Sequence, residues 1–79
     1  MNIEYTPEER RLANEIADTL NDKNSIVLHL QYARKYKETF LRRILNQVMS
    51  VAEDKIKKSR AALYTFLIIR GSDYDDARH

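Results

Sequence analysis

The sequence predicts a small all-α protein, a bundle of three to four helices. Its 79 residues include one proline and one glycine, Pro7 and Gly71, which stand where a helix could begin and where one could end. No stretch alternates apolar and polar residues between turn signals, as a half-buried strand would. A chain this short forms one domain and buries only about 60% of the surface that it exposes when unfolded. We therefore expect a single helical domain over residues 1–71, followed by an acidic, disordered tail over residues 72–79.

The first helix is expected to begin after Thr6. Thr6 is a good N-cap, Pro7 suits the first helical position, and Glu9 completes a Thr-x-x-Glu capping box. The polar run over residues 21–24 should end this helix. Its apolar residues share one face and should be buried: Leu12, Ala13, Ile16, Ala17 and Leu20.

A second helix should follow a cap at Asn24 or Ser25. The register of apolar residues changes around Tyr36 and Lys37, which indicates either a tight turn or a kink. The apolar stripe of the second helix is expected to comprise Ile26, Leu30 and Ala33, widened by Val27, Leu28 and Tyr36.

The third helix, about residues 38–49, has the clearest amphipathic pattern of the chain. Its apolar residues recur at spacings of one, three and four, so we expect it to be the central core element. These residues are Phe40, Leu41, Ile44, Leu45, Val48 and Met49.

Two interpretations of residues 51–70 stay open. Ser50 and Glu53 repeat the Ser-x-x-Glu capping signature and should open new helical structure. Either one helix covers residues 51–70, or a short turn is followed by a fresh helix capped by Ser59. Both interpretations place the same residues in the core: Leu63, Phe66 and Leu67.

Basic residues are concentrated in the middle of the chain. Residues 34–60 carry nine basic and three acidic side chains, whereas residues 1–33 carry three and six, although the formal net charge is only +2. A basic face attracts phosphate with salt-dependent affinity. The same residues also suit the solvated face of an ordinary amphipathic helix. The candidate phosphate-contacting residues are Lys55, Lys57, Lys58 and Arg60, supported by Arg34, Lys35, Arg42 and Arg43.

Apolar residues near position 50 also match the spacing of a helix-turn-helix. Leu45, Met49, Val51 and Ile56 fall at its apolar positions, with the turn near Ser50. The second helix would then present the lysines of residues 55–58 to the major groove. Three aromatic residues could stack on bases, although aromatic residues on helix faces more commonly belong to the core: Tyr32, Tyr36 and Tyr64.

The segments HLQYARKYKETFLRRILNQVM and SRAALYTFLI, within roughly residues 28–69, carry a family resemblance. They resemble the small helical C-terminal domains of bacterial replication-initiation and primosomal-loader proteins of the DnaD kind. The resemblance implies a helical module that contacts DNA and partner proteins. Tyr64, Ile68 and Ile69 approximate the family's Tyr-x-x-x-hydrophobic segment.

The sequence offers no group of residues suited to catalysis. Without cysteine there is no disulfide, thiolate nucleophile or Cys-based zinc site, and the single Gly71 cannot form a Gly-rich phosphate loop. His29 and His79 have no second ligand at metal spacing, and His29 should lie at the surface or boundary of its helix. The adjacent Glu8 and Glu9 suit the first turn of a helix better than acid–base chemistry. We expect neither an enzyme nor a metal or other cofactor.

Residues 61–69 are apolar on nearly every side of a helix, more than a three-helix core can cover. Surplus apolar surface on a small domain commonly marks an interface, and homodimerisation would enlarge the core. The expected interface residues are Tyr64, Ile68 and Ile69. We interpret the chain as a non-enzymatic helical binding module associated with nucleic acid, with a protein-interaction or dimerisation adaptor as the alternative.

Localisation is inferred from absent signals. The sequence has no apolar run of about 18 residues and no signal peptide, and its lack of cysteine suits a reducing compartment. We therefore expect a cytoplasmic protein without membrane contact.

Overall fold

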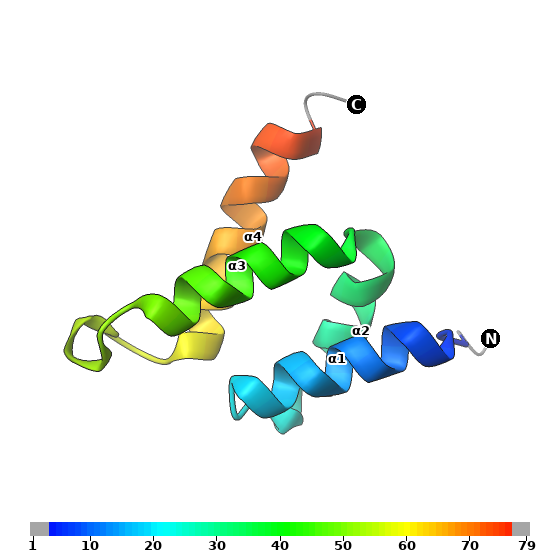
Figure 1. Cartoon of the computed structure of the whole chain (residues 1–79), viewed down its shortest axis with the longest axis horizontal. Coiled ribbons are helices and arrows are strands. Elements are labelled where there is room, and N and C mark those ends of the chain that lie inside the picture. Colours follow the sequence, from blue (N-terminus) through cyan, green and yellow to red (C-terminus); the bar gives the residue numbers. More distant parts are fainter. Residues whose placement is uncertain (1–3, 77–79) are drawn as a thin grey trace. The chain divides into compact units, whose positions relative to one another are not determined.

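The computed structural model describes residues 4–76, with side chains described as far as Gly71. Residues 4–76 contain no strand, which confirms the prediction of a small all-α protein, and none of their helices is long and apolar enough to cross a membrane. Two compact units divide the chain within the third helix, one ending at Leu41 and the other beginning at Arg42. The elements in chain order are α1 (Pro7–Thr19), η1 (Lys23–Ser25), α2 (Ile26–Lys35), α3 (Glu38–Ser50), η2 (Glu53–Lys55) and α4 (Arg60–Asp76), where η marks a 3₁₀ helix (Figure 1).

Both ends of α1 are fixed by hydrogen bonds among residues close in the sequence. The predicted capping box is present: Glu9 N donates to Thr6 Oγ1 over 3.1 Å, and Thr6 N donates to Glu9 Oε1 over 2.8 Å. After α1, Asn21 adopts a left-handed conformation with φ of 55°. Asp22 N then donates to Ala17 O over 2.7 Å and Asn21 N to Asp18 O over 3.1 Å, the two hydrogen bonds of a Schellman motif. Asparagine tolerates this conformation better than most residues, so the polar run ends α1 as predicted.

In the first unit α1 packs against α2. The five residues predicted for the buried face of α1 are all buried: Leu12, Ala13, Ile16, Ala17 and Leu20. On α2 the outcome differs from the prediction. His29 is the buried residue of that helix, whereas Ile26, Leu30 and Ala33 are only half-buried and Val27 is exposed.

The change of register at residues 36 and 37 is a tight turn. The helix α2 ends at Lys35, Tyr36 has an extended backbone with φ of −115° and ψ of 155°, and α3 begins at Glu38. The predicted third helix is thus confirmed nearly to the residue. Its buried side chains are Leu41, Ile44, Leu45 and Val48, while Phe40 is half-buried and Met49 is exposed.

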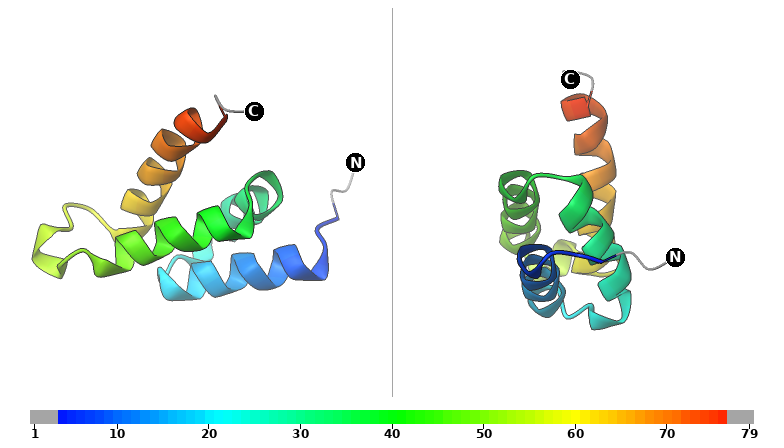
Figure 2. Two further views of the ribbon diagram at one scale, coloured as in Figure 1. Left: turned by 45° about the horizontal axis from the view of Figure 1, so that its top comes forward. Right: turned by 90° about the vertical axis from the view of Figure 1, so that its right-hand side faces the viewer.

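The second interpretation of residues 51–70 is the correct one. Residues 51–59 form a connection that contains only the 3₁₀ helix η2, and the left view in Figure 2 shows it as a loop between α3 and α4. The helix α4 is capped by Ser59, whose Oγ accepts from Ala62 N over 3.0 Å. The capping box predicted at Ser50 does not form, because Ser50 is the last residue of α3 and its hydroxyl donates to Gln47 O over 2.8 Å.

Two further predictions in this region are wrong. A helix-turn-helix joins its helices by a turn of about three or four residues, but here residues 51–59 intervene. Lys55, at the end of η2, and Lys57 and Lys58 therefore lie in this connection and not on α4. In addition, α4 passes through Gly71 and continues to Asp76, although a helix end was expected at that glycine. Residues 77–79 of the predicted tail lie outside the described residues.

Candidate interaction surfaces

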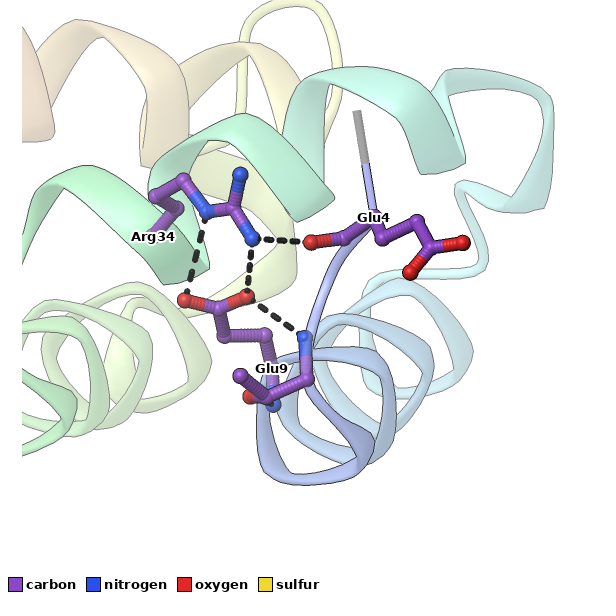
Figure 3. Close-up of polar contacts among 4 residues, drawn as sticks. Glu4, Glu9 and Arg34 are labelled. Atoms are coloured by element: carbon purple, nitrogen blue, oxygen red, sulfur yellow. Dashed lines mark hydrogen bonds and ion pairs between the residues drawn. The ribbon is translucent and has the colours of Figure 1, made fainter. Parts of the chain in front are cut away.

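Arg34, a predicted phosphate contact, forms its hydrogen bonds with other residues of the first unit. Its Nη2 lies 3.0 Å from Glu9 Oε1 and its Nε lies 3.4 Å from Glu9 Oε2. The same Nη2 also donates to the backbone carbonyl of Glu4, so one guanidinium joins α2 to the segment before α1 (Figure 3). Its Cζ lies 4.5 Å from the centroid of the Tyr5 ring, a cation–π arrangement. Arg34 therefore holds the N-terminal segment and has few donors left for a phosphate.

Glu9 has two partners that favour its ionised form. The hydrogen bond from Arg34, followed by the hydrogen bond from the backbone amide of Thr6, lowers the pKa of Glu9 below its ordinary value of 4.5. The carboxylate thus serves the capping box of α1 and the ion pair with α2 together. Of the two adjacent glutamates, Glu9 is therefore the one that links α1 to Arg34 on α2.

Arg60, another predicted phosphate contact, is used inside the second unit. It is the first residue of α4, and its Nη1 donates to the carbonyl oxygen of Val48 over 2.6 Å. The last carbonyls of a helix have no intrahelical donor, and the carboxyl end carries a partial negative charge. The guanidinium of Arg60 therefore caps the carboxyl end of α3 and fixes the start of α4 against it.

The other predicted basic residues have different surroundings. Lys35 is exposed and its Nζ lies 5.4 Å from the centroid of the Tyr36 ring. Arg42 is half-buried and Arg43 is exposed on α3. Three lysines remain together in the loop before α4, all exposed and without an ion pair to any described residue: Lys55, Lys57 and Lys58. Glu53 and Asp54 are exposed in the same loop and offset part of this charge.

The two sides of α4 differ sharply in exposure. Tyr64 and Ile68, both predicted as interface residues, have no exposed surface, so they serve the core and cannot meet a partner without rearrangement. Ile69, the third predicted interface residue, is 54% exposed, and Phe66, which was predicted to be core, is 52% exposed. The predicted core residues Leu63 and Leu67 are half-buried.

The exposed apolar residues of α4 form a continuous stripe. Ala62, Phe66 and Ile69 are exposed and follow one another at spacings of four and three, which places them on one face of the helix. The Cζ of Arg70 lies 5.4 Å from the centroid of the Phe66 ring at the edge of this face. We call these three residues the outer stripe of α4.

His29 is a feature that the sequence did not reveal, since it was expected at the surface or boundary of α2. Only 1% of the residue is exposed, and its Nε2 lies 3.0 Å from Asp22 Oδ2. Asp22 directly follows Asn21, so the turn that ends α1 also delivers the carboxylate to the buried ring. A polar residue before a helix, seven positions from a histidine, was the one sequence signal for this pair.

The three tyrosines predicted to stack on bases are buried or half-buried. Tyr64 is buried. The rings of Tyr32 and Tyr36 lie 5.8 Å apart between centroids, and those of Tyr36 and Phe40 lie 5.4 Å apart, with all three residues half-buried. These aromatic residues therefore pack on one another at the turn between α2 and α3.

Neither a metal centre nor a known relative identifies a functional site among the described residues. Within residues 4–76 no group of three His, Cys, Asp or Glu side chains is placed to hold a metal ion. No family model, curated protein or solved structure matches the chain. The candidate surfaces are therefore the lysines of residues 55–58 and the outer stripe of α4.

Proposed function

We propose that this chain is a non-enzymatic protein-interaction module that binds through the outer stripe of α4. The observation that carries the proposal is the exposure of Phe66 and Ile69, each more than half exposed on one helix face. Single exposed apolar residues are ordinary, but adjacent ones aligned along a helix are typical of helix-mediated recognition. The adaptor alternative is preferred to nucleic-acid binding because Arg34 and Arg60 already serve the fold.

Site-specific photo-crosslinking tests this proposal. A benzoylphenylalanine at position 69, introduced in the cells that express the chain, should give covalent protein adducts, and Phe66→Ala should reduce them. The matched control is the same probe at Val27, which is 62% exposed but lies on α2, away from the stripe. Equal adduct yields at positions 27 and 69, or none at either, would refute the proposal.

A second candidate function is phosphate contact with nucleic acid, favoured by Lys55, Lys57 and Lys58. These three exposed lysines precede the amino end of α4, where the helix dipole is positive. Their affinity for duplex DNA, single-stranded DNA or RNA should fall as salt rises. The DnaD-like resemblance is consistent with this candidate.

The test is a titration of each nucleic acid at two salt concentrations. The double reversal Lys57→Glu with Lys58→Glu should abolish binding, whereas Arg11→Glu, an exposed reversal on α1, should weaken it far less. Absence of binding by the unmodified chain at low salt would remove this candidate.

A further inference from the structure

The charges at the two ends of α4 are opposite to those that a helix prefers. A helix is stabilised by acidic residues in its first turn and by basic residues in its last turn, as α1 illustrates with Glu8 and Glu9 at its start. The first turn of α4 has no acidic residue, and its last turn has no basic one. The sequence instead gives Lys57, Lys58 and Arg60 at the amino end, and it ends the helix with Asp73, Asp75 and Asp76.

A second α4 lying antiparallel to the first would reverse this disadvantage. The acidic end of each helix would lie beside the basic amino end of the other, where both the lysines and the helix dipole attract it. Phe66 and Ile69 of the outer stripe support the same arrangement, because they lie near the middle of α4, between the two charged ends. A two-fold axis makes every such contact occur twice, since residue i meets residue j and j meets i.

Resting on the proposed function of the outer stripe, we infer that its partner is a second copy of this chain, bound antiparallel along α4. Phe66 of each copy packs against Ile69 of the other, and the carboxyl end of each α4, where the sequence has Asp75 and Asp76, lies beside the amino end of the other. The sequence has no acidic residue between positions 55 and 72, so within the chain the lysines of residues 55–58 have only Glu53 and Asp54 nearby, which offset part of their charge.

The expected dimer is weak. A helix of 17 residues is about 25 Å long, and one stripe along it buries less than the roughly 1,200 Å² of a standard stable interface. The dissociation constant should therefore be on the order of 100 µM, which corresponds to a transient complex. Salt should weaken the dimer, because part of its binding free energy comes from attraction between exposed charges, which salt screens.

The test is sedimentation equilibrium of the full chain from about 10 µM to 1 mM at low and high salt, since that range brackets the expected constant. The mass should rise toward that of a dimer, and Ile69→Glu should keep it monomeric, whereas Val27→Glu should not. Circular dichroism confirms that each variant is folded, and both substitutions are at exposed positions. A monomer at the highest concentration overturns the inference.

A charge exchange tests the antiparallel arrangement itself. The variant Lys57→Glu with Lys58→Glu and the variant Asp75→Lys with Asp76→Lys should each self-associate at least fivefold more weakly than the unmodified chain. A mixture of the two variants should recover association, because each reversed end then meets a reversed partner. A dimer that depends on Ile69 but shows no recovery in the mixture overturns the antiparallel inference. Adducts at position 69 with other proteins, but not with this chain, would overturn the inference and leave the proposed function standing.

Discussion

Truncation of Ile68 to alanine should destabilise the protein much more than truncation of its neighbour Ile69. Ile68 has no exposed surface, whereas Ile69 is 54% exposed. The change removes three carbon atoms, worth about 0.8 kcal/mol each when buried, and the cavity adds to this, so Ile68→Ala should cost about 3 kcal/mol. Ile69→Ala should cost about 1 kcal/mol or less, because much of its side chain already contacts water.

This difference is large on the scale of the whole protein. At 0.05–0.15 kcal/mol per residue, a chain of 79 residues has a free energy of unfolding of about 4–12 kcal/mol. With a urea m-value near 1 kcal/mol/M, Ile68→Ala should lower the midpoint by about 2–3 M. The assay is urea unfolding followed by circular dichroism at two protein concentrations, since dimerisation through Ile69 would add a concentration-dependent contribution. Equal midpoint shifts for the two variants would refute the assignment of Ile68 to the core and Ile69 to the surface.

Three further predictions concern the caps and the buried histidine. In urea unfolding, His29→Ala should lower the free energy of unfolding by about 2 kcal/mol or more, and Asp22→Asn should lower it by about 1 kcal/mol. A His29→Ala variant as stable as the parent would contradict burial of the ring. Ser59→Ala should cost about 1 kcal/mol in thermal unfolding, whereas Ser50→Ala should cost less than about 0.5 kcal/mol, because only Ser59 caps a helix. Since the pKa of Glu9 is lowered in the folded state, the stability that its ionised form contributes is present above its ordinary value of 4.5 and is lost as the pH falls through the lowered pKa. The stability gap between the parent and Glu9→Gln should thus be present at pH 7 and shrink below pH 4.5, and a gap that stays constant to pH 3 would contradict this.

The parts of the fold that follow from local chemistry were predictable. The capping box of Thr6 and Glu9 needs only residues three apart, and the buried face of α1 follows from one unambiguous helical period. The break at Tyr36 was also visible, because a change of register is a local property of the sequence. These elements depend on their own residues more than on their neighbours in space.

The orientation of α4 was not predictable, and the reason is its composition. A hydrophobic period locates the buried face only where polar residues mark the opposite face. Between Ala61 and Ile69 the only such residue is Thr65, so the sequence does not distinguish a core of Leu63, Phe66 and Leu67 from the observed core of Tyr64 and Ile68. Three of the six assignments made for α4 were therefore exchanged: two expected interface residues are buried, and Phe66 is exposed.

The burial of His29 was missed for a different reason. Its helix offered Ile26, Leu30 and Ala33 as an apolar stripe, and a histidine among them is ordinarily placed at the edge. Burial of a polar ring becomes acceptable once a partner is supplied, and that partner, Asp22, is positioned by the left-handed turn at Asn21. The sequence contains both residues, but their meeting depends on how α1 and α2 are joined.

Arginine and lysine make different contacts in this protein, which explains why a count of basic residues overestimated the number of side chains available to phosphate. A guanidinium has several donors in a rigid plane and can serve a carboxylate and a carbonyl at once, as Arg34 does, or cap a helix end, as Arg60 does. A lysine ammonium is more strongly hydrated and is less suited to such fixed geometry, and Lys55, Lys57 and Lys58 remain in water. An arginine within a cluster of positive charge can thus be committed to the fold, while the neighbouring lysines stay available. Of the predicted phosphate contacts, Lys55, Lys57 and Lys58 therefore keep their charge exposed, whereas Arg34 and Arg60 are held by contacts within the protein.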